Sequence, residues 1–263
     1  VQVDAKSVAV VADTWWHAKK ALDALPIEWD KGENTKVSSE SIAKWLEEGL
    51  TAETKFVGNK QGDAAAAIAG AAKKVEAVYA YPYQNHACLE PMNATVLYTP
   101  EKCEVWTSTQ NGEAAYAAAI AASGLPADKV EVHRLLLGTG FGRRTRSDYV
   151  TEATNIAKQM PGTPIKMLKS REEDMTNGVY HPVTQCKLTG ALDKDGNLTG
   201  MHMRISGQSI LAYARPEAMQ AGADPAAFQG LNPGGAEGQF GYDIPNLLID
   251  HAMRNPPVPP GFW

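Results

Sequence analysis

The sequence has few of the residues from which metal clusters are built. Its 263 residues include only three cysteines, and Cys88, Cys103 and Cys186 form no Cys-x-x-Cys pair. Iron–sulfur clusters and structural zinc sites require several ligands at characteristic spacings. These cysteines therefore cannot build either centre within this chain, and any such centre is expected on another chain.

Long apolar runs and a basic surface are also missing. No run of about 18 apolar residues predicts a membrane-spanning helix, and the first residues lack the charged-then-apolar layout of an export signal. The formal net charge is -5, with Lys and Arg spread along the chain, so no nucleic-acid-binding stripe is indicated. We expect no nucleic-acid partner, and membrane association only through parts outside this sequence.

What is present is typical of a globular protein, with 44% hydrophobic and 21% charged residues. Helical spacing and capping residues alternate with period-two stretches, and the hairpin chemistry of 193–197 joins two strands. The sequence thus predicts an α+β fold with mixed sheets and packed helices. The expected helices cover 15–25, 39–49, 64–74, 114–123, 148–160, 170–175 and part of 212–227, and the expected strands cover 7–12, 26–30, 75–81, 94–98, 104–108, 130–136, 164–168, 184–192, 198–207 and 247–251.

One glycine-rich turn stands out at residues 137–144, Leu-Gly-Thr-Gly-Phe-Gly-Arg-Arg. It follows the expected strand 130–136, and its three glycines at alternate positions let the backbone turn tightly and approach a bound group. Backbone N–H groups beside two arginines suit an anion such as a phosphate or an oxo group. A simple turn remains the alternative, and the glycine spacing excludes the dinucleotide fingerprint.

A second candidate is the pair His86 and Glu90, four residues apart. On one face of a helix this pair could ligate a metal. Pro91 follows at once and the flanks are strand-like, so a buried polar hydrogen-bonded pair is the alternative. No nucleophile elbow or Walker loop occurs in the chain.

Four motifs follow one another along the chain: 86–94 (HACLEPMNA), 106–110 (WTSTQ), 138–144 (GTGFGRR) and 170–175 (SREEDM). In this order they resemble the molybdenum-cofactor subunit of the xanthine dehydrogenase and aldehyde oxidase family. Within that family, the Glu-Pro-Met-Asn string and the Phe-Gly-Arg-Arg ending are similar to the isoquinoline 1-oxidoreductase beta subunit, or membrane-bound aldehyde dehydrogenase, branch.

The resemblance implies roles for the residues of these motifs. Gln110 matches the glutamine that family members place beside the molybdenum oxo ligand, where its amide can donate. The turn matches the backbone that lies against the metal and the pterin, and we expect its arginines to contact a phosphate or the substrate. The expected cofactor-binding residues are Gln110, Gly138, Gly140, Phe141, Gly142, Arg143 and Arg144.

Two departures from the family bear on the substrate. Xanthine-oxidising members carry a glutamate just after the turn and an arginine before a His-Pro pair, where this chain has Thr145 and Tyr180 before His181-Pro182. The resemblance therefore implies an aldehyde or an N-heterocycle such as isoquinoline as substrate, and not a purine. Electrons would pass to a separate iron–sulfur subunit.

A third departure concerns the family's general base, a glutamate in a downstream Gly-Glu-Pro motif. The nearest candidate here, Ala236-Glu237-Gly238, lacks the proline. The chain is accordingly expected to be an excised fragment with no catalytic residue of its own, inactive by itself and binding no cofactor or binding it only weakly.

The resemblance also implies a domain organisation and a cofactor. Residues 1–36, which end in the polar linker 31–36, match the close of a hammerhead-like α/β segment, and 37–263 match the N-terminal portion of a molybdopterin-binding domain. The complete protein would hold a molybdopterin cofactor in the cytosine dinucleotide form and work in the periplasm or at the inner membrane of a bacterium. The alternative is a non-catalytic α+β binding or scaffolding domain that keeps the fold.

Overall fold

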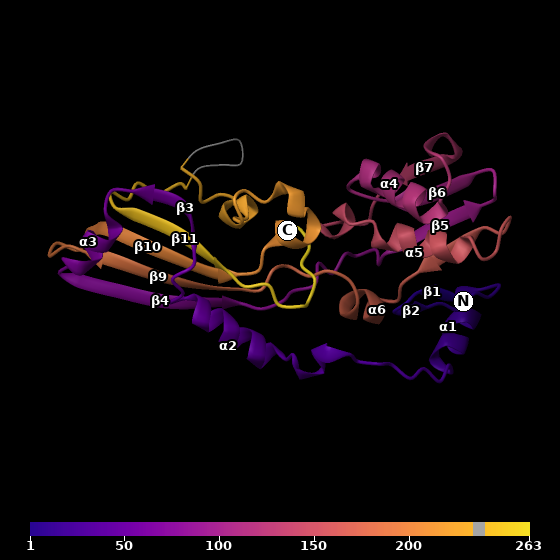
Figure 1. Cartoon of the computed structure of the whole chain (residues 1–263), viewed down its shortest axis with the longest axis horizontal. Helices are drawn as coiled ribbons and strands as arrows, with labels where there is room; N and C mark the ends of the chain where they lie inside the picture. The colour runs from indigo at the N-terminus through magenta and orange to yellow at the C-terminus, as the bar shows by residue number, and fades with distance from the viewer. Residues whose placement is uncertain (234–239) are drawn as a thin grey trace. The chain divides into compact units, whose positions relative to one another are not determined.

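The structure, a computed structural model, describes residues 1–233 and 240–263 as an α+β protein (Figure 1). Its contacts divide the chain into two compact units. Unit 1 comprises Val1–Asp30, Asn85–Val179 and Phe262–Trp263, and unit 2 comprises Lys31–Gln84 and Tyr180–Gly261. The predicted α+β class is confirmed.

Unit 1 is built on a four-stranded mixed sheet of order β7-β6-β5-β8. Only β6 and β7 run parallel, whereas β5 pairs antiparallel with both β6 and β8. The elements of the unit are β1 (Gln2–Asp4), β2 (Ser7–Val8), α1 (Trp15–Asp23), β5 (Asn93–Tyr98), β6 (Cys103–Ser108), α4 (Gly112–Ser123), η2 (Ala127–Lys129), β7 (Val130–Leu135), η3 (Arg143–Thr145), α5 (Asp148–Ala157), β8 (Ile165–Leu168) and α6 (Arg171–Thr176).

One face of this sheet carries the core of unit 1. Alternate strand residues such as Val96 and Val105 are fully buried, because successive side chains of a strand point to opposite faces. Helices α4 and α5 pack against these strands, α4 through small residues such as Ala115 and Ala119 (Figure 1). The alanine-rich sequence of α4 therefore serves close packing as well as helix propensity.

The parallel pairing of β6 and β7 positions the glycine-rich turn. Helix α4 is the crossover between the two strands, and Ser108 and Leu135 are register partners at their carboxyl ends. Parallel strands present their carboxyl ends at the same edge of a sheet. Gln110, two residues beyond β6, and the turn at 138–144, just beyond β7, therefore meet at one edge.

Unit 2 is built on a five-stranded sheet of order β3-β11-β10-β9-β4, in which only β10 and β11 are parallel. Ile249 and Leu247 of strand β11 lie in its core with Phe228. The elements are η1 (Glu33–Lys36), α2 (Ser39–Gly49), β3 (Phe56–Gln61), α3 (Ala64–Ala69), β4 (Lys73–Tyr81), β9 (Thr184–Leu192), β10 (Leu198–Gly207), α7 (Ile210–Ala214), η4 (Pro216–Ala218), η5 (Pro225–Phe228) and β11 (Leu247–Met253).

Helices with capping residues were predicted well. The Thr14 side chain accepts a hydrogen bond from the His17 N–H at the start of α1, and Ser38 with Ser41 forms a capping box at α2. Gly124 ends α4 in the left-handed conformation. The predicted hairpin is confirmed as β9 and β10.

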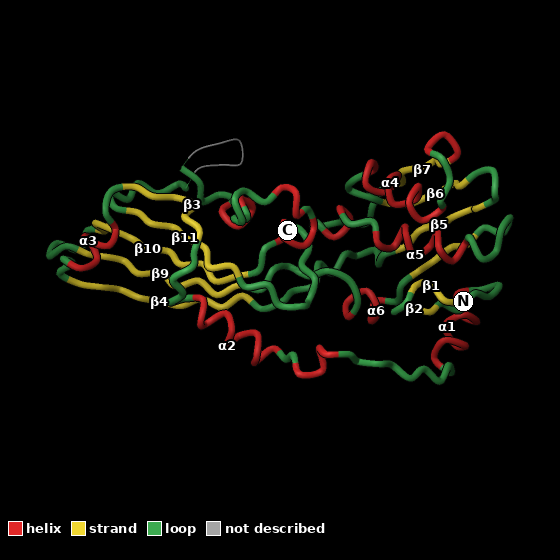
Figure 2. Tube along the Cα trace, viewed as in Figure 1, coloured by secondary structure: helices red, strands yellow, loops and turns green. Residues whose placement is uncertain are grey.

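Several secondary-structure predictions were wrong or too long, and the helices expected at 15–25 and 148–160 end two and three residues early. Residues 26–30 form no strand and lie in the loop after α1 (Figure 2), and β2 is shorter than the strand expected at 7–12. Helix α3 ends at Ala69 and Lys73 already belongs to β4, so helix propensity was overridden by sheet pairing with β9. The three strands expected at 75–81, 94–98 and 104–108 were also expected to pair with one another; β5 and β6 do so, but β4 belongs to the other sheet.

Two further predictions concern domains and membranes. The units are defined by contacts and not by family, so the assignment of 1–36 to a hammerhead-like segment and of 37–263 to a molybdopterin-binding domain stays a prediction. Among the described residues, every helix falls short of the length and apolarity that crossing a bilayer requires.

Candidate functional site: a glycine-rich turn anchored by Gln110

The turn after β7 has an unusual backbone. Thr139 and Phe141 have φ of 72° and 50°, a region that residues with a side chain rarely adopt, and Gly142 has φ of 90°. Each such non-glycine residue costs about 1–3 kcal/mol and is found mainly where surrounding contacts enforce it, often at functional sites. The turn is therefore held in place by its neighbours.

Gln110 is the main anchor of this backbone. Its side-chain Oε1 accepts hydrogen bonds from the backbone N–H groups of Gly142 at 3.2 Å and Arg144 at 3.1 Å. The backbone N–H of Gln110 donates to the Arg144 carbonyl at 3.1 Å. Because both N–H groups donate to the same atom of the Gln110 side-chain amide, that atom must be the oxygen and not the nitrogen. The Nε2 group must then point away from these donors, and it has no hydrogen-bond acceptor among the described residues.

Two glycines of the turn are required by close approach. A Cβ on Gly140 would lie 2.3 Å from Oε1 of Gln110, and a Cβ on Gly142 would lie 2.4 Å from the carbonyl oxygen of Trp263. Both distances are far below van der Waals contact. Gly140 thus lets the backbone of the turn lie directly against the Gln110 amide, and Gly142 lets it lie against the carbonyl groups of Phe262 and Trp263.

Arg144 lies entirely inside unit 1. Its guanidinium donates to the Thr139 and Ser108 carbonyls, to Oγ of Ser108, and to both the carbonyl and Oε2 of Glu90, the last at 2.9 Å. The side chain is 0% exposed. Arg144 therefore ties the turn to the end of β6 and to the segment before β5.

Arg143 is equally enclosed and makes a two-pronged ion pair, 2.7 Å from Nη1 to Oδ1 and 2.7 Å from Nη2 to Oδ2 of Asp148. The expectation that Arg143 and Arg144 contact a phosphate or a substrate is therefore corrected. The guanidinium N–H groups described above already donate to acceptors inside the protein. Both side chains are buried, because the conformation of the turn directs them into unit 1. Their role is to hold the turn.

These ion pairs predict how stability changes with pH. Burial opposes ionisation of Asp148, yet the hydrogen bonds and charge of Arg143 lower its pKa. A carboxyl whose folded pKa is depressed stabilises the fold above its unfolded pKa of about 3.9, and the contribution is lost as pH falls through the folded value. We expect Asp148→Asn to lower the free energy of unfolding near pH 7 and to flatten its decline below about pH 4.

Urea unfolding at a series of pH values measures this effect. The matched control is Asp128→Asn, since Asp128 is 75% exposed and its carboxylate lies 3.9 Å from Lys129. Equal pH slopes for the wild-type chain and Asp148→Asn would contradict the role given to this pair.

Glu90 is a site residue that the sequence analysis considered only as a partner of His86. Burial raises the pKa of Glu90, but hydrogen bonds from the Gly138 N–H and Asn93 and the charge of Arg144 outweigh it, so the pKa is lowered. His86 Nε2 instead lies 2.6 Å from the Phe262 carbonyl oxygen. The two residues form neither the metal pair nor the hydrogen-bonded pair considered from the sequence, because this segment is not helical and Glu90 faces the turn.

The turn fits an oxygen-rich ligand at its outer side. In the described part of the chain, the N–H groups of Gly140 and Phe141 and the Nε2 of Gln110 have no acceptor, although Gly140 is buried. Buried backbone donors are nearly always paired, so the open N–H of the buried Gly140 beside strained backbone indicates a place for a bound group, to which the exposed donors of Phe141 and Gln110 could also contribute. The side chain of Phe141, in the same turn, is 56% exposed.

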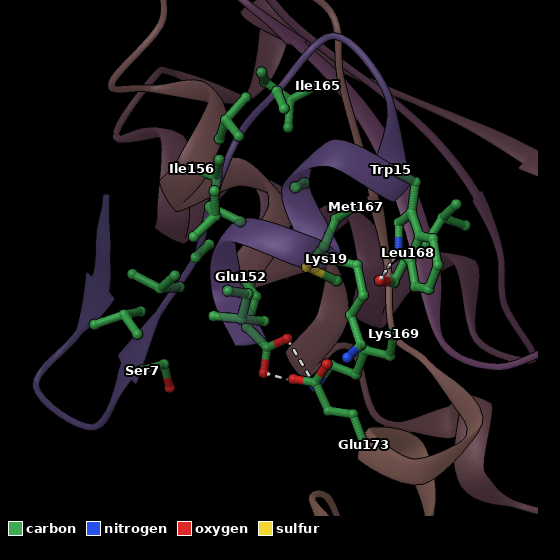
Figure 3. Close-up of a pocket in the computed structure, with 18 of the residues that line it drawn as sticks. Ser7, Trp15, Lys19, Glu152, Ile156, Ile165, Met167, Leu168, Lys169 and Glu173 are labelled. Carbon is green, nitrogen blue, oxygen red and sulfur yellow. Dashed lines mark hydrogen bonds and ion pairs between the residues drawn. The ribbon is translucent and has the colours of Figure 1, made fainter. Parts of the chain in front are cut away.

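A cavity of about 580 Å³ also lies in unit 1 (Figure 3). It is lined by the N-terminal segment with α1, by β8 and by part of α5, and contains the ion pair between Lys169 Nζ and Glu152 Oε2 at 2.9 Å. None of the seven predicted site residues lines it. The cavity is therefore not where the turn and Gln110 would hold a ligand.

The remaining candidates bear on catalysis and substrate. The hydroxyl of Thr145 donates a hydrogen bond to the Gly142 carbonyl at 2.6 Å. Tyr180 and His181 belong to unit 2. The nearest counterpart of the family's catalytic glutamate, Ala236-Glu237-Gly238, lies outside the described residues.

Curated relatives are oxidoreductases or their subunits. The chain is 25% identical over 249 residues to the membrane-bound aldehyde dehydrogenase [pyrroloquinoline-quinone] of Gluconacetobacter polyoxogenes, spanning 94% of this chain and 32% of that protein. It is 30% identical over 169 residues to the isoquinoline 1-oxidoreductase subunit beta of Brevundimonas diminuta, spanning 62% of this chain and 20% of that protein. The chain thus spans no more than about a third of the length of these relatives.

Solved structures share the fold. Quinoline 2-oxidoreductase from Pseudomonas putida 86 matches with a TM-score of 0.66 at 16% identity, over 96% of this chain and 32% of that chain. Residues 48–223, more than half of the sequence, match the family model described as the molybdopterin cofactor-binding domain. This chain therefore belongs to the molybdopterin cofactor-binding domain family.

Proposed function

We propose that this chain forms one wall of the cofactor site of a molybdenum hydroxylase that oxidises an aldehyde or an N-heterocycle. Water would supply the oxygen atom, and the two electrons released per turnover would pass to a separate iron–sulfur subunit. The cofactor would be molybdopterin in its cytosine dinucleotide form, and the complete protein would work in the periplasm or at the inner membrane. The family membership of residues 48–223 supports the cofactor class.

The observation that carries the proposal is the Gln110 amide. Its oxygen is spent on the Gly142 and Arg144 N–H groups, which leaves its Nε2 as an oriented donor at the edge of the turn. A donor whose direction is fixed before the ligand arrives stabilises a negative oxygen at no reorganisation cost. The open N–H groups of Gly140 and Phe141 lie in the same turn and would act with it.

The other residues of the site prepare this edge. Gly140 lets the backbone pass close to the Gln110 amide. The buried ion pairs of Arg144 with Glu90 and of Arg143 with Asp148 stabilise the turn. When bound, the molybdenum cofactor supplies the two-electron redox centre, chemistry that no side chain provides. The chain's own contribution is binding, orientation and hydrogen-bond donation.

The substrate class follows from the lack of a charged side chain directly after the arginines of the turn. Thr145, directly after the arginines, is half-buried and its hydroxyl is already bonded to Gly142, so no charged side chain at this position could read a purine. A neutral aromatic or aliphatic carbonyl compound, or a neutral N-heterocycle, suits such a site. Two relatives are named for an aldehyde and for isoquinoline as substrates.

The role of Gln110 is tested with two substitutions in the protein that contains this chain, produced in a host that makes molybdopterin. Gln110→Glu keeps an acceptor for the Gly142 and Arg144 N–H groups but removes the donor, so we expect molybdenum content near wild type and a turnover number reduced about 100-fold. Gln110→Ala also removes the anchor, and molybdenum and pterin content should fall.

Metal analysis, pterin fluorescence and aldehyde-dependent dye reduction measure these effects. Gln61→Glu, at an exposed position in β3, is the matched control and should change none of them. Wild-type metal content and turnover in both Gln110 variants would exclude the proposed role.

A further inference from the structure

The outer face of the unit 1 sheet carries a cluster of ligand-type side chains on β6 and β7. In the parallel register Glu104 pairs with Glu131, and Trp106 pairs with His133. These four residues point away from α4 and α5, because the alternate residues Val105 and Val132 face the core. They do not belong to the glycine-rich turn.

The histidine of this cluster lies near both carboxylates but beyond hydrogen-bond distance of either. His133 Nε2 lies 3.7 Å from Oε1 of Glu104 and 3.7 Å from Oε1 of Glu131, too far for hydrogen bonds. This nitrogen is shielded from solvent and has no hydrogen-bond partner among the described residues. The polar atom therefore points between two carboxylates without bonding to either.

Such separations are those of ligands around one ion. A zinc ion bonds histidine nitrogen and carboxylate oxygen at about 2.0–2.2 Å, so ligand atoms in a tetrahedral site stand about 3.3–3.6 Å apart. One ligand atom from each of Glu104, Glu131 and His133 lies within 4.8 Å of the others, so small side-chain rotations would close the set. Trp106 stacks on the imidazole at 4.9 Å between centroids and 15° between planes, which fixes the ring.

A cation already occupies the space between the carboxylates. Nζ of Lys102 lies 2.9 Å from Oε1 of Glu104 and 3.0 Å from Oε2 of Glu131. Hydrogen bonds to these carboxylates raise the pKa of Lys102, and the Lys102 hydrogen bond lowers the pKa of Glu131. The lysine side chain is 48% exposed, so its ammonium can move into water when another cation arrives.

We propose that Glu104, Glu131 and His133 form a binding site for a divalent transition metal of the zinc class, for which the ammonium group of Lys102 competes. One imidazole nitrogen with two carboxylate oxygens favours zinc over magnesium or calcium, which prefer oxygen ligands alone. The ion would join β6 to the edge strand β7. These are the two strands whose carboxyl ends lead to Gln110 and to the turn.

Zinc titration of the metal-stripped 263-residue chain, by calorimetry and by competition with a chromophoric chelator, tests this site. We expect one ion per chain, an affinity at least tenfold weaker in His133→Ala, and an affinity at least threefold tighter in Lys102→Met, where the competitor is gone. A gain of affinity cannot come from misfolding. His17→Ala is the matched control, because His17 is an exposed unit 1 histidine that also lies beside a carboxylate, Asp13.

Two results would overturn the site. One is the absence of stoichiometric zinc binding by the folded chain, with circular dichroism as the check on folding. The other is an affinity that His133→Ala leaves unchanged while His17→Ala lowers it, which would place the ion elsewhere.

Discussion

Replacing Arg144 with methionine is expected to destabilise the protein by about 3 kcal/mol, the lower end of the range for removing one partner of a buried ion pair. The arginine is 0% exposed, whereas the Glu90 side chain keeps 35% exposure and can be partly rehydrated. The loss also leaves the Ser108 and Thr139 carbonyls without this donor. Urea unfolding of the wild-type and variant chains measures the difference.

Lysine is expected to rescue little of this loss. A single ammonium cannot reproduce the planar set of donors that Arg144 extends to four residues. Arg134→Met is the matched control, since Arg134 is an exposed arginine of β7, and it should change stability by less than about 0.5 kcal/mol. Similar stability of Arg144→Met and Arg134→Met would show that the internal network does not hold the turn.

Replacing Gly142 with alanine is the second change with a large expected effect. The backbone there has φ of 90°, and the added Cβ would lie 2.4 Å and 2.5 Å from the carbonyl oxygens of Trp263 and Phe262. Backbone atoms cannot swing aside as a flexible side chain can. We expect a loss of about 3 kcal/mol or more, combining left-handed strain with displacement of the neighbouring chain.

Gly162→Ala separates the two contributions. Gly162 has φ of 80°, but a Cβ added there would meet no atom within 4 Å, so its substitution carries only the conformational cost of about 1–2 kcal/mol. The difference between the two variants in thermal or urea unfolding is then the cost of the close approach. Equal losses would mean that the backbone over the turn is free to move.

The elements that sequence reasoning found were those with local signals. Helix α2 begins where Ser38 caps it, α4 stops at Gly124, and the hairpin of β9 and β10 follows its turn chemistry. Where signals were only propensities, pairing decided otherwise. The alanine-rich run of α3 gives way at Lys73 to a strand that pairs along its length with β9.

The two arginines of the turn illustrate what local reasoning misses. Two adjacent guanidinium groups beside glycines are typical of an anion site, and the resemblance to the isoquinoline 1-oxidoreductase branch, which includes both arginines, does not say in which direction their side chains point. Their direction depends on Glu90, distant in sequence from Arg144, and on the buried space beneath the turn. No spacing rule contains that information.

By itself the sequence determined the α+β class, most helix and strand positions, and the grouping of Gln110 with the turn at 138–144 through their family motifs. Only the tertiary structure decided that Gln110 directs its oxygen to the turn and its nitrogen outward, and that Arg143 and Arg144 face inward. The physical reason is the parallel pairing of β6 and β7. It brings two segments separated by a helix to one sheet edge, where long-range contacts fix the direction of each side chain.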